Sequence, residues 1–85
     1  MKLTEFRNGR SKEYIINNEH DFAAYLRNYD DETLMFSHNL YDAISLINRH
    51  FGWKLNDAGD FIETDKYYIS VDGNKMIEKV NKIQL

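Results

Sequence analysis

The side chains that could bind a metal ion or act as a nucleophile are few and widely spaced. His20, His38 and His50 form neither a His-x-His nor a His-x-x-x-His pair, and the chain has no cysteine. Ser37 precedes His38, but adjacency in sequence does not aim an imidazole at a hydroxyl, and there is no Gly-x-Ser-x-Gly motif. We therefore expect a non-enzymatic protein with no catalytic residue, metal site or cofactor.

Carboxylates, in contrast, gather in the middle of the chain. Residues 13–65 hold eleven acidic residues against three basic ones, a net charge of −8, whereas the two ends together carry +5. Rows of carboxylates can imitate the phosphates of a nucleic acid and steer the protein to a basic surface. If Glu63 and Asp65 lie on one strand, their side chains leave the same face about 6.7 Å apart. The candidate partner-binding residues are Asp30, Asp31, Glu32, Asp57, Asp60, Glu63, Asp65 and Tyr68.

A competing interpretation is that these acids only solubilise the surface and mark turns and helix ends, where Asp is common for local reasons. The overall net charge of −3 is small for a mimic of nucleic acid. It still disfavours direct binding of nucleic acid or of an anionic membrane.

Turn residues define the first element. Asn8 and Gly9 supply the two positive-φ positions that a type I′ hairpin turn requires. Lys2–Arg7 should therefore pair with Arg10–Ile16, in a register that places Glu5 opposite Lys12.

Capping residues and apolar spacing predict two helices. Asn18 caps the first, which ends near Asp30, and Asn39 caps the second, which ends before Gly52. Thr33–Phe36, between them, is expected to be a short buried strand. The apolar stripes are Phe22, Tyr25, Leu26 and Tyr29 in the first helix, and Leu40, Ala43, Ile44, Ile47 and Phe51 in the second.

The remainder predicts strands. Trp53–Leu55 and Phe61–Glu63 flank a loop, and Tyr67–Asp72 alternates between apolar and polar residues up to a turn at Gly73. Residues 75–85 fit a helical stripe or a strand, and the preceding turn favours the strand. We expect a single α+β domain over residues 1–85, a two-layer sandwich in the order ββ-α-β-α-βββ, with two helices packed on one face of a mostly antiparallel sheet.

No apolar segment is long enough for a secretory signal or a membrane span, so we expect a cytoplasmic protein that does not bind membranes. If the chain is encoded by a phage, that cytoplasm is the host cell's. Phe, Tyr, Ile, Asn and Lys are plentiful and proline is absent, a composition typical of AT-rich genes such as those of many phages and mobile elements.

Three functional hypotheses remain. The leading one is a protein-binding protein, a phage or mobile-element inhibitor of a host defence or nucleic-acid-processing protein, whose acidic surface and one aromatic residue occupy the partner's basic site. The second is a small, dimeric DNA-binding regulator that contacts DNA through the Arg7–Lys12 hairpin. The third is an accessory subunit that binds through an apolar sheet face.

Overall fold

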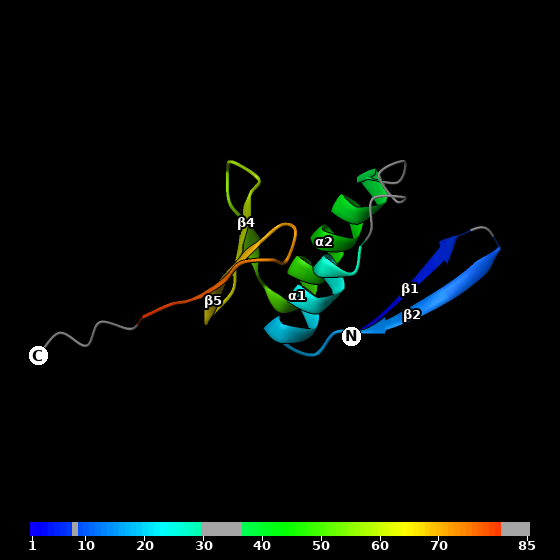
Figure 1. Cartoon of the computed structure of the whole chain (residues 1–85), viewed down its shortest axis with the longest axis horizontal. Helices are drawn as coiled ribbons and strands as arrows, with labels where there is room; N and C mark the ends of the chain where they lie inside the picture. The colour runs from blue at the N-terminus through cyan, green and yellow to red at the C-terminus, as the bar shows by residue number, and fades with distance from the viewer. Residues whose placement is uncertain (8, 30–36, 81–85) are drawn as a thin grey trace, which may run out of the picture.

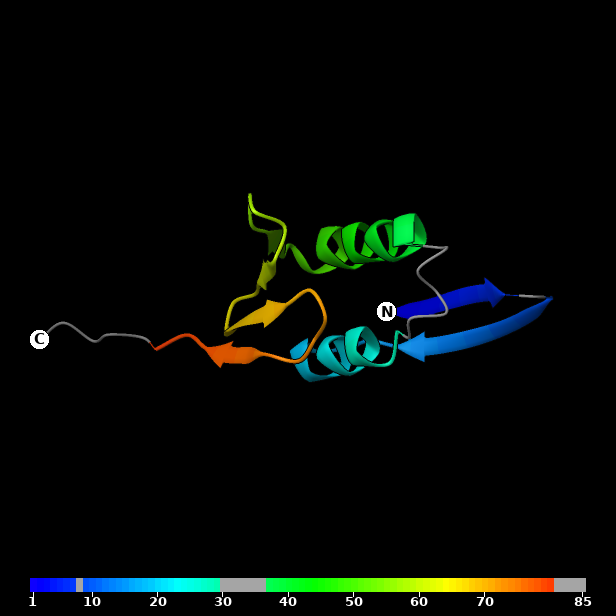
Figure 2. The same cartoon turned by 45° about the horizontal axis from the view of Figure 1, so that its top comes forward.

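The computed structural model describes residues 1–7, 9–29 and 37–80, and these form two helices and two antiparallel sheets. The helices lie between the two sheets along the long axis of the molecule (Figures 1 and 2). The first sheet pairs β1 (Lys2–Arg7) with β2 (Arg10–Ile15), the helices are α1 (Glu19–Arg27) and α2 (Ser37–Phe51), and the second sheet has the order β3 (Lys54–Leu55), β4 (Phe61–Glu63), β5 (Tyr67–Ser70) and β6 (Met76–Glu78).

The α+β class and the antiparallel pairing are as predicted, but the strands form two sheets instead of one. The hairpin forms its own sheet because β2 leads almost directly into α1, which separates it from the later strands (Figure 1). The last four strands form a meander, and β6 confirms the strand over the alternative helix for residues 76–78. The strand expected at Thr33–Phe36 lies outside the described residues.

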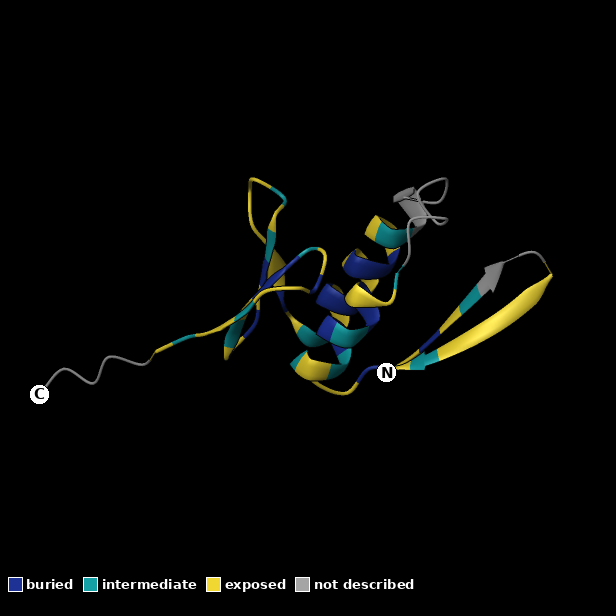
Figure 3. Cartoon of the chain, viewed as in Figure 1, coloured by how far each residue is buried: buried dark blue, intermediate teal, exposed yellow. Residues whose placement is uncertain are grey.

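The hairpin has the predicted register, with Glu5 opposite Lys12, and Gly9 has the expected positive φ of 76°. A hydrogen bond links the hairpin to α1: the Tyr25 hydroxyl donates at 2.6 Å to the Glu5 carboxylate. The Tyr14 ring also meets the Tyr25 ring edge-on at 4.8 Å between centroids. Most of β2 is otherwise exposed, so the hairpin extends from the body as an arm (Figure 3).

Helix α1 begins as predicted and ends slightly early. The Asn18 side chain accepts a 2.9 Å hydrogen bond from the Asp21 amide, while the Asp21 carboxylate accepts one of 3.0 Å from the Asn17 amide. This reciprocal cap satisfies two amide donors that would otherwise lack a partner. The helix ends at Arg27 with Asn28 as its C-cap, before the Asp30 expected from the sequence.

Helix α2 corrects one prediction and confirms another. Residues 37–39 already have helical backbone, so Asn39 cannot adopt the extended conformation that an N-cap requires. The helix ends at Phe51, just before Gly52, as predicted, and Gly52 has a φ of 77°. The Trp53 amide donates a 2.9 Å bond back to the Asn48 carbonyl, which is the Schellman pattern.

The core joins both helices to the inner face of the meander. Trp53 stacks between two rings, with its centroid 4.4 Å from that of Phe51 and 5.4 Å from that of Phe22. Six side chains are the largest that are completely buried: Ile16, Phe22, Ile44, Ile47, Ile62 and Ile69. The predicted stripes of α1 and α2 all contribute to this core or pack against it.

The turn between β5 and β6 is held tightly against α1. The Asp72 carboxylate accepts bonds from the Ser70 hydroxyl (2.6 Å) and the Asn74 amide (2.9 Å), which shapes the turn. Gly73 at its centre is buried, and its carbonyl accepts a 2.9 Å bond from the Arg27 guanidinium. A Cβ atom there would overlap the Ala23 carbonyl oxygen and lie 2.9 Å from the Arg27 amide nitrogen. Only glycine fits this approach.

We expect Gly73→Ala to lower the free energy of unfolding by about 2–5 kcal/mol, because it adds a backbone clash to the strain of a positive φ. Gly59→Ala is the matched control: Gly59 has φ 77° but nothing within 4 Å of the new methyl group, so strain alone should cost about 1–2 kcal/mol. Urea denaturation of both variants measures the difference. Equal losses would show that the turn does not touch α1.

Tyr25 should make the fold sensitive to alkali. Burial and the hydrogen bond to Glu5 raise the pKa of the Tyr25 hydroxyl well above its usual range. Above about pH 10 the unfolded chain therefore loses a proton that the folded chain keeps, and the free energy of unfolding falls as pH rises.

Tyr25→Phe should cost about 1–3 kcal/mol at neutral pH, because it removes a hydrogen bond to a charged group, and should flatten the fall in stability between pH 9 and 11. Tyr41→Phe, which removes an exposed hydroxyl, should keep the native slope. Urea titrations at several pH values test this, and an unchanged slope in Tyr25→Phe would contradict it.

Candidate functional site: the outer face of the meander

The two faces of the meander differ in composition. Strand pairing aligns one row of residues toward the helices and the next row away from them. The inner row is Leu55, Ile62, Ile69 and Met76, and the outer row is Lys54, Glu63, Tyr68 and Ile77. Tyr68 is 40% exposed and Ile77 is 52% exposed, so two large apolar side chains face solvent side by side.

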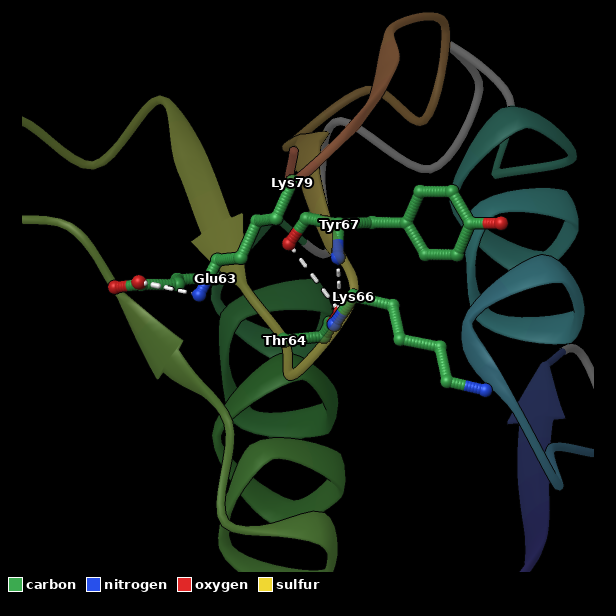
Figure 4. Close-up of polar contacts among 5 residues, drawn as sticks. All are labelled: Glu63, Thr64, Lys66, Tyr67 and Lys79. Carbon is green, nitrogen blue, oxygen red and sulfur yellow. Dashed lines mark hydrogen bonds and ion pairs between the residues drawn. The ribbon is translucent and has the colours of Figure 1, made fainter. Parts of the chain in front are cut away.

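A lysine reaches across this outer face. The Lys79 ammonium lies 2.6 Å from the Glu63 carboxylate (Figure 4) and 5.1 Å from the centre of the Tyr68 ring. The hydrogen bond from Lys79 lowers the pKa of the Glu63 carboxyl, with a smaller contribution from Lys54, and the same bond raises the pKa of Lys79. Lys79 therefore neutralises Glu63, and its side chain passes over the tyrosine.

A buried threonine ends β4 and begins the turn to β5. The Thr64 hydroxyl accepts bonds from the amides of Lys66 (3.2 Å) and Tyr67 (2.9 Å) and donates to the Tyr67 carbonyl at 3.2 Å (Figure 4). Asp65 therefore lies in this turn. The strand ends at Glu63, as the sequence predicted for Phe61–Glu63, so the condition that would place Glu63 and Asp65 on one strand is not met.

Two shallow hollows of similar size lie on either side of Glu63. One, of about 210 Å³, is mainly apolar and is lined by Asn56, Phe61, Glu63, Tyr68 and Ile77. The other, of about 200 Å³, is mainly polar and is lined by Gly52, Trp53, Lys54, Glu63, Thr64, Asp65 and Lys79. The apolar hollow can accept a side chain from a partner, whereas the polar one already contains balanced charges.

The loop between β3 and β4 holds two acids beside the apolar hollow. The Asn56 side chain accepts bonds from the Asp60 amide (2.9 Å) and the Phe61 amide (3.0 Å), which fixes the loop while Asp57 and Asp60 remain exposed. Neither carboxylate forms an ion pair with any residue that the structure describes. These two acids are therefore uncompensated negative charge on the loop that contributes Asn56 to the lining of the hollow.

The structure thus brings together part of the predicted site. Tyr68, Glu63, Asp57 and Asp60 belong to the outer face or its bordering loop, whereas Asp65 lies in the turn beyond β4. Asp30, Asp31 and Glu32 lie outside the described residues.

Phe61, Ile77 and Lys79 were missed as site residues. The alternation over Tyr67–Asp72, continued through the turn at Gly73, could have placed Ile77 beside Tyr68. No local signal pairs Lys79 with Glu63, because that contact depends on the strand register.

Within residues 1–7, 9–29 and 37–80, no three metal-ligating side chains come together, and neither helix combines the length and apolar character needed to cross a bilayer. Comparisons with family models, curated proteins and solved structures found no match.

The Glu63–Lys79 pair can be tested by titration. In Lys79→Met the pKa of the Glu63 carboxyl should rise toward its ordinary range, because the hydrogen bond that stabilises the carboxylate is lost. In Lys75→Met, which removes an exposed lysine that makes no ion pair with a described residue, the pKa should stay lowered. NMR titration of the side-chain carboxyl carbon reads this directly. A Glu63 pKa that does not respond to loss of Lys79 would contradict the pairing.

Proposed function

We propose that this is a non-enzymatic protein-binding protein that docks a partner on the outer face of its meander. The observation that carries the proposal is the apolar hollow between Phe61, Tyr68 and Ile77, which adjoins at Asn56 the loop that carries the unpaired carboxylates of Asp57 and Asp60. Apolar contact and uncompensated charge lie side by side there, as they do in many protein interfaces.

The apolar part would supply most of the affinity. Tyr68 and Ile77 are each about half exposed, and covering such side chains contributes on the order of 1 kcal/mol each. Tyrosine is also enriched among the residues that dominate binding energy, because it buries a large rigid surface and keeps a polar hydroxyl. A partner side chain that enters the hollow would contact Tyr68 directly.

The charged part would select the partner. Asp57 and Asp60 favour lysine or arginine beside the inserted apolar side chain, and their attraction would speed encounter in a salt-dependent way. Glu63 contributes less, because Lys79 already compensates it. The partner we propose is therefore a protein with a basic surface around an exposed apolar residue.

Nucleic-acid-processing and defence proteins carry such basic surfaces. The amino-acid composition, which is typical of AT-rich genes, supports a phage or mobile element as the source. Inhibition of a host defence or nucleic-acid-processing protein, in the host cytoplasm, is the specific role that we propose.

A second candidate function is DNA binding through the hairpin arm. The arm extends from the body (Figure 3), Arg7 is paired with Arg10 beside its tip, and Lys12 is exposed. A two-stranded ribbon of this kind fits a major groove. The acidic surplus of the central segment opposes it, so we rank it second.

Site-specific photo-crosslinking in the native host separates the two. Benzoylphenylalanine at Tyr68 should capture one defined protein, whereas the same probe at Tyr41, which is 49% exposed on α2, should not. With the purified partner, Tyr68→Ala should weaken binding at least tenfold, and Asp57→Lys with Asp60→Lys should weaken it more at low salt than at high salt. Identical products from positions 68 and 41 would refute the proposal. A third probe at Arg10 tests the hairpin arm, and nucleic acid captured from that position would favour DNA binding.

A further inference from the structure

The meander ends in β6, a strand at the edge of its sheet. Among the described residues, β6 pairs only with β5. The Ser70 amide bonds to the Lys75 carbonyl and the Lys79 amide to the Lys66 carbonyl, so residues 75, 77 and 79 direct their backbone groups toward β5. The N–H and C=O groups of Met76 and Glu78 therefore point away from the sheet.

The edge lacks one common form of protection. A lysine side chain on an edge strand commonly blocks pairing with another chain. Here Lys79 is drawn back across its own sheet, over Tyr68 to Glu63, and so leaves the edge. Ile77, half exposed at the centre of β6, lies beside the open backbone groups. There is no proline in the chain to interrupt the edge.

We infer that β6 pairs with β6 of a second copy of this chain, in antiparallel register with Ile77 on the two-fold axis. In this register Met76 lies opposite Glu78 of the second copy. The outward backbone N–H of each residue donates to the outward C=O of the other, so the pair forms two hydrogen bonds. Ile77 then faces Ile77 of the second copy as a non-hydrogen-bonded pair, the closer of the two pair types. The register is thus self-complementary in both backbone and apolar contact.

The charges permit this register. Lys75 lies opposite Lys79 of the second copy, but the ammonium of Lys79 is held by Glu63 and does not face the incoming strand. The alternative register that centres on Glu78 would place two unpaired carboxylates against each other across the axis. Pairing at Ile77 avoids that repulsion.

The result is a continuous eight-stranded sheet that carries two copies of the outer face on one side. The contact is short, so the dimer should be weak, with a dissociation constant in the micromolar range or above. The inference is independent of the partner proposed above, because the crosslinking probe at Tyr68 reports on the partner whether or not β6 is paired.

Disulfide trapping tests the pairing, since the chain has no cysteine of its own. In Ile77→Cys the two Cβ atoms would lie about 4.5–5.5 Å apart, close enough for a disulfide to form with a small adjustment. We expect this variant to form a covalent dimer at least tenfold faster than Leu46→Cys, whose position on α2 is 48% exposed. Glu78→Cys should react more slowly than Ile77→Cys, because its partner position is Met76.

Sedimentation of the unmodified chain provides a second measurement. The sedimentation coefficient should rise with concentration between about 10 μM and 1 mM, and Ile77→Lys should abolish the rise while leaving the circular dichroism spectrum unchanged. Equal trapping rates at positions 46 and 77, faster trapping at 78, or a monomer at every concentration would overturn the inference.

Discussion

The close approach of the Gly73 turn to helix α1 is the contact on which the arrangement of the meander depends. The backbone of Gly73 lies so near to α1 that no side chain fits between them, and the Arg27 guanidinium bonds to the Gly73 carbonyl. The turn joins β5 to β6. Its position against α1 therefore fixes where Tyr68 and Ile77 lie and which face of the meander is turned outward.

Helix α1 connects the two sheets. One of its sides receives the meander at Gly73, and Tyr25 holds the hairpin through Glu5. A helix of nine residues is too short to be stable alone, so the contacts on its two sides and its N-cap at Asn18 must stabilise it. The buried ring stack of Phe22, Trp53 and Phe51 ties this helix to the end of α2.

The features that the sequence predicted well are local ones. The turn at Gly9, the cap at Asn18 and the helix end at Gly52 each depend on a few adjacent residues, and all three are present. The two apolar stripes are also correct, because burial on one side imposes a helical period on the residues themselves. These patterns were enough to define the α+β class.

The errors concern contacts made between distant parts of the chain. Lys79 from the basic C-terminal part folds back onto Glu63, a contact that the sequence did not predict. The split into two sheets likewise depends on where α1 packs. A turn explains Gly73 in the sequence, yet its approach to a helix 46 residues away in the chain follows only from the tertiary structure.

The most direct test of this arrangement is the proximity of Gly73 to α1 in solution. Nuclear Overhauser spectroscopy should show cross-peaks from the Gly73 α-protons to the Leu26 side chain and the Arg27 amide, alongside the cross-strand peaks between Tyr68 and Ile77. If the cross-strand peaks are present and those from Gly73 to α1 are absent, the meander forms without docking on α1, and the account is wrong.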